Sequence, residues 1–108
     1  MTHLDIKPLS VNEAWKGRRI KTGAYKRYER DVLTMLPKII VPDGALCVSL
    51  CFGFSSKSAD ADNPVKCFLD CLQKKYGFND NRVYKLNIEK VDVAKGCEFV
   101  KFSIDSIS

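Results

Sequence analysis

Large apolar side chains alternate with small ones over residues 46–54, a pattern typical of a strand with one buried face. The apolar positions are Leu46, Val48, Leu50, Phe52 and Phe54. The positions between them carry only small side chains, at Cys47, Ser49, Cys51 and Gly53. The sequence therefore predicts a strand here, with one face in the core and another on which a neighbouring group can pack closely.

The same alternation is repeated more briefly near both ends of the chain. Leu4 and Ile6 predict a short first strand, and segments 84–88 and 100–104 predict two further strands with one apolar face each. We expect Lys95–Gly96 to close a hairpin between these last two strands. Residues 10–23 are polar and basic with two glycines, which is typical of a loop.

Two segments carry apolar residues at helical spacing instead. The first stripe consists of Tyr25, Tyr28, Val32, Met35 and Leu36, and Pro37 stops that helix. The second consists of Val65, Phe68, Leu69, Leu72 and Tyr76. Asn63–Pro64 favours a helix start and Gly77 a helix end, so both boundaries of the second helix are predicted.

The resulting order is β-α-β-α-β-β, with no internal repeat or linker. It predicts an α+β domain in which two main helices pack on one face of a small mixed β-sheet. A chain of 108 residues forms one domain, residues 1–108, and is long enough to bury a core without disulfides. Neither end resembles a signal peptide and no apolar run approaches a membrane span, so we expect a cytoplasmic protein without membrane partners.

The five cysteines are expected to be free thiols. Two C-x3-C units, Cys47/Cys51 and Cys67/Cys71, raise the question of zinc. Residues four apart on a strand lie about 13 Å apart, too far to share one ion. On a helix Cys67 and Cys71 could approach each other, but the only histidine, His3, lies at the N-terminus. We therefore expect no zinc, and we interpret these cysteines as small buried side chains.

Positive charge is concentrated in one segment of the chain. The net charge is +5, and residues 16–30 contribute +6 of it, so the remainder carries −1. The basic residues of this segment are Lys16, Arg18, Arg19, Lys21, Lys26, Arg27 and Arg30, against a single acid, Glu29. This distribution is typical of a surface that binds a polyanion, although a solvated helix face would give the same pattern.

The segment Asp60-Ala61-Asp62-Asn63 holds the most informative acids. In an extended backbone, residues two apart point the same way, so both carboxylates would face one space. A hard cation such as Mg²⁺ would offset their repulsion, and a solvated turn before the helix is the alternative. A calcium-binding EF-hand is excluded because its sixth position is Val65 instead of glycine and its twelfth is Cys71 instead of glutamate.

Two other charged residues have a structural and a functional interpretation. Lys66 lies within reach of Asp70 in an i,i+4 pair, or of a phosphate beside a bound metal. Asp80 lies in an Asn-Asp-Asn sequence that suits a turn. No serine or cysteine nucleophile motif, phosphate-binding loop or dinucleotide-binding glycine pattern occurs in the chain.

In their order and spacing these features resemble the RusA family of Holliday-junction resolvases, which occurs in phages and prophages. The resemblance runs from about residue 4 to 104. It rests on Ser10-Val11-Asn12 with Trp15, Arg18 and Arg19, on Tyr25-Lys26-Arg27-Tyr28, on Asp60-Ala61-Asp62-Asn63 with Lys66, and on Asp80, Val83 and Lys90. The chain has one acid, flanked by asparagines, where the family usually has adjacent acids, and only Lys57 where the family is rich in arginine.

The resemblance implies an Mg²⁺-dependent endonuclease that resolves Holliday junctions or other branched DNA in recombination and repair. Asp60, Asp62 and Asp80 would hold one or two Mg²⁺ ions, and Lys66 would complete the catalytic set. The residues implied in DNA binding are Asn12, Lys16, Arg18, Arg19, Lys21, Lys26, Arg27, Lys57 and Lys90. A homodimer is implied as well, with the tyrosine stripe or the small-residue face of 47–53 as its surface. The alternative is a non-catalytic, basic DNA- or protein-binding module of phage origin.

Overall fold

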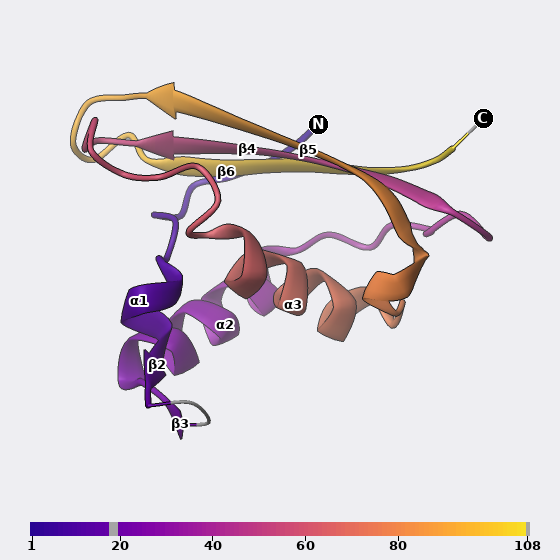
Figure 1. The fold of residues 1–108 in the computed structure, drawn as a ribbon, viewed down its shortest axis with the longest axis horizontal. Coiled ribbons are helices and arrows are strands. Elements are labelled where there is room, and N and C mark those ends of the chain that lie inside the picture. Colours follow the sequence, from indigo (N-terminus) through magenta and orange to yellow (C-terminus); the bar gives the residue numbers. More distant parts are fainter. Residues whose placement is uncertain (18–19, 108) are drawn as a thin grey trace.

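The computed structural model describes residues 1–17 and 20–107, and its main feature is a four-stranded mixed sheet (Figure 1). The strands are β1 (Thr2–Leu4), β4 (Leu46–Phe54), β5 (Val83–Asp92) and β6 (Phe99–Ser106), in the spatial order β1-β6-β4-β5. β4 runs parallel to β5 and antiparallel to β6, and β1 is antiparallel to β6. The most apolar strand of the sequence thus lies inside the sheet.

The predicted hairpin between the last two strands is wrong. β5 and β6 lie on opposite sides of β4, so the chain crosses the end of β4 between them. Lys95–Gly96 does form a turn there, with Gly96 in the left-handed region at φ 94°. A local turn signal identifies a reversal of the chain, but the packing of β4 decides which strand lies beside which.

Two helices, α2 (Gly23–Met35) and α3 (Val65–Tyr76), cover one face of the sheet, which confirms the predicted α+β class (Figure 1). Their apolar stripes, apart from the exposed Met35, enter a common core with the even-numbered side chains of β4. Gly77 ends α3 at φ 72°, as predicted. Pro64 is the residue before α3, so the helix begins slightly later than Asn63 suggested. Of the helices in the described residues, none is long and apolar enough to span a bilayer.

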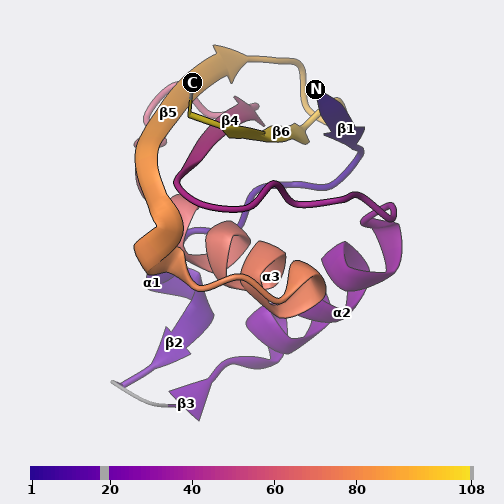
Figure 2. The same ribbon diagram turned by 90° about the vertical axis from the view of Figure 1, so that its right-hand side faces the viewer.

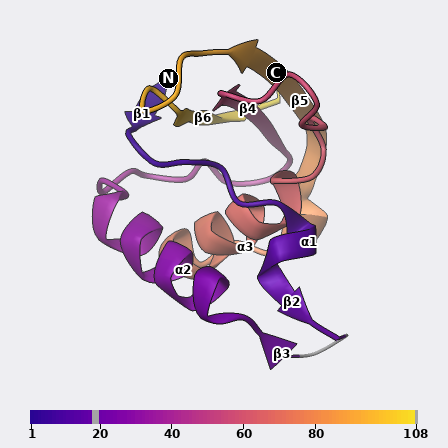
Figure 3. The same ribbon diagram turned by 90° about the vertical axis from the view of Figure 1, so that its left-hand side faces the viewer.

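The segment interpreted as a loop, residues 10–23, contains regular structure. A short helix, α1 (Val11–Ala14), is capped by Ser10, whose Oγ accepts the Asn12 N–H at 3.2 Å. β2 (Trp15–Lys16) and β3 (Ile20–Lys21) then pair as a small antiparallel ribbon. Figure 3 shows this ribbon extending from the helical layer, away from the sheet. The elements are too short to leave a hydrophobic period in the sequence.

The apolar face predicted for 84–88 is not buried. Tyr84 is 76% exposed, and Leu86 and Ile88 are each 39% exposed. β5 is an edge strand of the sheet, and the helices do not reach over it (Figure 2). Alternation along this strand correctly predicts its secondary structure, but its place at the sheet edge leaves the apolar side chains partly in solvent.

A close contact forms on the small-residue face of β4. A Cβ added to Gly53 would lie 2.4 Å from ring carbons of Phe99, whose ring covers the glycine. Phe99 is itself 9% exposed and stacks on His3 at 5.1 Å between ring centroids. The expectation that a group packs closely on this face is therefore met by an aromatic ring of the same chain.

Gly53→Ala is accordingly expected to destabilise the fold by about 1–3 kcal/mol, because the Phe99 ring must lift off the sheet. Urea denaturation followed by circular dichroism measures the change. Ser103→Ala, on the same face of the neighbouring β6, is the matched control and should change stability by less than about 0.5 kcal/mol. Equal stability of the Gly53→Ala and Ser103→Ala proteins would contradict this packing.

Candidate functional site

Asp60 and Asp62 lie in a turn that leads into α3. The Asn63 N–H donates to the Asp60 carbonyl at 3.3 Å, and the Val65 N–H donates to the Asp62 carbonyl at 3.2 Å. Both aspartates are exposed. The extended backbone expected here is therefore wrong, because Pro64 and the first turn of α3 continue the turn backward into this segment. Both aspartates instead lie in the turn before the N-terminus of α3, where the helix dipole favours negative charge.

A backbone hydrogen bond joins this turn to the N-terminal part of the chain. The Val11 N–H donates to the Asn63 carbonyl at 2.9 Å. This contact fixes the start of α1 against the Asp60–Asn63 turn, and α1 leads directly into the β2–β3 ribbon (Figure 3). Asn12 is exposed at this junction. No pattern in the sequence indicates that these distant segments meet.

Asp80 lies at the other end of α3. It begins a short 3-10 helix, η1 (Asp80–Arg82), directly before β5. The 12 residues of α3 span about 18 Å and separate it from the Asp60–Asp62 turn. Its N–H donates to Gln73 Oε1 at 3.0 Å, as a turn residue would. Within residues 1–17 and 20–107, no three acidic, cysteine or histidine side chains are close enough to hold a metal together.

Lys66 forms the i,i+4 pair that the sequence suggested. Its Nζ lies 3.6 Å from Asp70 Oδ2, and its side chain is 63% exposed. The Tyr25 hydroxyl donates to the same carboxylate at 3.5 Å. An exposed pair of this kind contributes only about 0.2–0.5 kcal/mol, so little free energy opposes the movement of Lys66 toward another anion.

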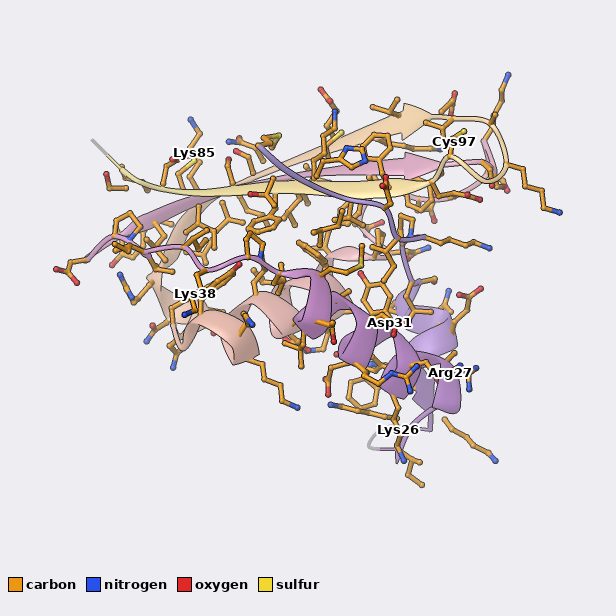
Figure 4. All side chains as sticks on the ribbon, turned by 180° about the vertical axis from the view of Figure 1, so that it is seen from behind. Lys26, Arg27, Asp31, Lys38, Lys85 and Cys97 are labelled. Atoms are coloured by element: carbon orange, nitrogen blue, oxygen red, sulfur yellow. The ribbon has the colours of Figure 1, made fainter. Side chains whose placement is uncertain are left out.

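The basic residues of 16–30 do not all offer their charge to solvent in the same way. Lys26 and Arg27 are exposed on the first part of α2, away from the sheet (Figure 4). Lys16 is exposed on the ribbon. Lys21 is committed to Glu29 at 2.9 Å and also lies 5.0 Å from the centre of the Tyr25 ring. Arg18 and Arg19 lie outside the described residues.

Lys57 and Lys90 meet where β4 and β5 end. The Lys90 ammonium donates to the Lys57 carbonyl at 2.8 Å and lies 5.9 Å from the centre of the Phe54 ring. Because Lys57 precedes Asp60 by three residues, this contact brings the end of β5 to the loop that carries the acids. Lys90 is therefore held by the Lys57 carbonyl and the Phe54 ring.

Glu29 is the centre of an ion-pair cluster that ties the ribbon to both helices. Its side chain is 16% exposed and accepts from Lys21 at 2.9 Å and from Lys74 of α3 at 3.0 Å. Burial raises the pKa of this carboxyl, but the hydrogen bonds and charges of the two lysines outweigh burial, so the net pKa lies below its ordinary value. The charged form is thus favoured in the folded protein.

Glu29→Gln is expected to lower the free energy of unfolding by about 1 kcal/mol at neutral pH. The effect is no larger because solvent screens the charges of the two partly exposed lysines. Because the folded-state pKa is lowered, this stabilisation is present above the unfolded-state pKa of about 4.3 and is lost as the pH falls through the folded-state pKa. Urea denaturation between neutral and acidic pH should show the two proteins converging below about pH 4. The control is Asp31→Asn, whose exposed pair with Arg30 should matter little. A pH-independent difference would contradict the ion-pair explanation.

The two C-x3-C units lie in different environments. Cys67 and Cys71 are buried in the core, and burial raises the pKa of their thiols to about 11 and about 12. Cys51 lies on the other face of β4 and donates to Glu89 at 3.3 Å. The described cysteines are free thiols. Buried, protonated thiols of this kind suit packing better than nucleophilic chemistry.

Tyr25 and Tyr28 are core residues, 1% and 6% exposed. The suggestion that the tyrosine stripe forms a surface for a second chain is therefore wrong, because both rings are covered by the packing of α2 on α3 and on the sheet.

No protein-family model and no curated protein sequence matches this chain.

Proposed function

We propose that this chain binds branched DNA and cleaves it with Mg²⁺, as the likeness to the RusA resolvases implies. The observation that best supports the proposal is the Val11–Asn63 hydrogen bond. It joins the acidic turn to the start of α1, which leads into the basic ribbon, although these segments are far apart in the sequence. A phosphate bound by the basic residues would therefore lie near carboxylates able to hold a cation.

The donor set of this turn suits Mg²⁺. Proteins usually hold Mg²⁺ through one or two carboxylates, with water and substrate phosphate in the remaining positions. Asp60 and Asp62 provide two exposed carboxylates. When bound, Mg²⁺ supplies an activated water and neutralises charge on the leaving oxygen. Asp80 of the same chain is too distant to join these two residues.

The other residues of this end of the molecule bind and orient the DNA backbone. Lys26, Arg27 and Lys16 would contact phosphates without regard to sequence. Lys66 would leave Asp70 for a phosphate oxygen and oppose the negative charge that develops on it. Lys57, exposed beside the acids, would contact the strand on which the reaction occurs.

The direct test is cleavage of a panel of labelled DNAs: a four-way junction, a fork, a flap and a linear duplex. Cleavage of branched substrates that requires Mg²⁺ and stops with a chelator is expected. Retained binding without cleavage in Mg²⁺ or Mn²⁺ would contradict the endonuclease and leave the non-catalytic binding module.

A separate prediction concerns the basic surface. The triple variant Lys16→Ala, Lys26→Ala, Arg27→Ala is expected to weaken binding to every DNA shape and to lower the slope of log affinity against log salt by about 0.9 for each phosphate that the protein no longer neutralises. Fluorescence anisotropy over a range of salt concentrations measures that slope. The matched control replaces Lys38, Lys75 and Lys95, which are exposed on other parts of the molecule. Equal slopes for the two triple variants would place the DNA elsewhere.

A further inference from the structure

A hollow at the C-terminal end of α3 combines two lysines with apolar side chains. It has a volume of about 460 Å³ and is lined by Lys38, Ile39, Ile40, Lys75 and Tyr76. The first three belong to the connection from α2 to β4, and the last two to the final turn of α3. Figure 4 shows Lys38 on this connection, which runs between the helical layer and the sheet. None of these five residues is acidic, so the hollow is both apolar and positively charged.

The hollow is held in shape by contacts within the chain. The Tyr76 hydroxyl donates to the Pro37 carbonyl at 2.6 Å, which fastens the connection to the end of α3. Ile39 and Tyr76 are partly buried and pack against the hydrophobic core, so they form the floor. The Tyr76 ring is supported by Phe102, at 6.4 Å between ring centroids. A partner would therefore meet a preformed site, which lowers the entropic cost of binding.

The rim of the hollow carries a fully exposed isoleucine. Ile40 is 96% exposed, the highest value among the large apolar side chains that the structure describes. A single exposed apolar side chain is common on protein surfaces. Ile40, however, stands between two hollows, because it also lines a second one of about 270 Å³ together with Met1 and Ile104. A partner seated here would remove Ile40 from water.

The two rim lysines have no acidic partner in residues 1–17 and 20–107. No described carboxylate lies within 4 Å of Lys38 or Lys75. The neighbouring Lys74, by contrast, is committed to Glu29 at 3.0 Å. The dipole of α3 favours positive charge in its last turn, which explains Lys75 but not Lys38, since Lys38 lies outside the helix. Both charges are thus available to carboxylates of another molecule.

We propose that this hollow binds an acidic segment of another protein, in which a large apolar side chain is flanked by carboxylates. The apolar side chain would fill the hollow against Tyr76 and cover Ile40. The carboxylates would pair with Lys38 and Lys75. The 12 residues of α3 place this site about 18 Å from the Asp60–Asp62 turn, so a bound partner leaves that turn accessible. The interaction does not rest on the proposed function.

Other classes of partner fit the hollow less well. A nucleic acid would pair its phosphates with the lysines but would leave the apolar side chains uncovered. Anionic membranes are usually bound by clusters of about 4–8 basic residues, and this hollow offers two. A small molecule is usually buried over most of its surface. Here Lys38, Ile40 and Lys75 are exposed, so the hollow is shallow and favours a segment that its own protein also holds in place.

Fluorescence anisotropy with labelled peptides tests the proposal. The probe is the peptide Glu-Glu-Phe-Glu-Glu, which is expected to bind with a Kd of about 100 µM and more weakly as salt is added. The same peptide with serine in place of phenylalanine, or with lysine in place of every glutamate, should bind about tenfold more weakly or worse. Two-dimensional NMR of the protein should place the perturbed amides at residues 38–40 and 75–76.

Substitutions on the rim separate charge from apolar contact. Lys38→Glu combined with Lys75→Glu should weaken binding of the glutamate peptide about tenfold or more and strengthen binding of the lysine peptide. Ile40→Ser should weaken binding of the glutamate peptide about fivefold, and its 96% exposure means that the fold is unchanged. The matched control is Lys85→Glu combined with Lys95→Glu, which changes the net charge equally on other surfaces (Figure 4). It should bind like the wild type.

Several results would overturn the proposal. They are no binding at millimolar peptide, equal affinity for the phenylalanine and serine peptides, equal loss in the two double variants, or NMR perturbations confined to residues 16–30. Binding to phosphatidylserine vesicles that requires Lys38 and Lys75, without binding of the glutamate peptide, would replace the protein partner with a membrane. Peptide binding as expected by a protein that cleaves no DNA would leave this site intact and contradict only the proposed function.

Discussion

Asp62→Asn is expected to lower the Mg²⁺-dependent cleavage rate of branched DNA by about a thousandfold or more, or about 4 kcal/mol of transition-state stabilisation. The substitution keeps the size of the side chain but removes one of the two charges available to the cation in the turn before α3. DNA affinity should stay the same or rise, because the variant has one negative charge fewer near the phosphates. Single-turnover cleavage measures the rate, and anisotropy without divalent ions measures the affinity.

Asp43→Asn is the matched control, since Asp43 is an exposed carboxylate in a turn at the other end of β4. It should cleave at the wild-type rate. Wild-type cleavage by the Asp62→Asn protein would contradict the assignment of the metal to this turn. Equal loss of cleavage and of binding would instead indicate a damaged fold, which denaturation curves of the two proteins would reveal.

Lys66→Ala is expected to lower the cleavage rate of branched DNA by about a hundredfold while changing DNA affinity little, because Lys66 would oppose the charge that develops on the phosphate in the transition state. Its pair with Asp70 at 3.6 Å is exposed, so its loss should change the free energy of unfolding by less than about 0.5 kcal/mol. Single-turnover cleavage measures the rate, and anisotropy without divalent ions measures the affinity.

Lys75→Ala is the matched control, since Lys75 is an exposed lysine at the other end of α3. It should cleave at the wild-type rate. Wild-type cleavage by the Lys66→Ala protein would contradict the role proposed for Lys66 and leave only its helix pair with Asp70.

The strands and main helices were predictable because their periods are local. A strand or helix with one buried face repeats every 2 or about 3.6 residues, and that repeat is visible in β4, α2 and α3. The glycine that ends α3 was predictable for a similar reason, since the left-handed conformation there favours glycine. From these local features the α+β class followed, and the structure confirms it.

Predictions that depended on what lies beside an element were less successful. The 84–88 alternation predicted a buried face, but β5 lies at the sheet edge. The turn at Lys95–Gly96 predicted a hairpin, but β4 separates its two strands. The tyrosine stripe suggested a surface for a partner, but its two tyrosines are buried in the core beneath α2. In each case the neighbour comes from a distant part of the chain.

For the candidate site, the sequence singled out acids and basic residues whose chemistry suits a metal and a polyanion, because charge and spacing are properties of the chain alone. Whether those residues meet was decided by long-range packing. The Val11–Asn63 hydrogen bond joins the start of α1, which leads into the basic ribbon, to the turn that carries Asp60 and Asp62. The length of α3 keeps Asp80 away from that turn. Contacts of this kind depend on the fit between whole elements, which leaves no periodic trace in the residues that make them.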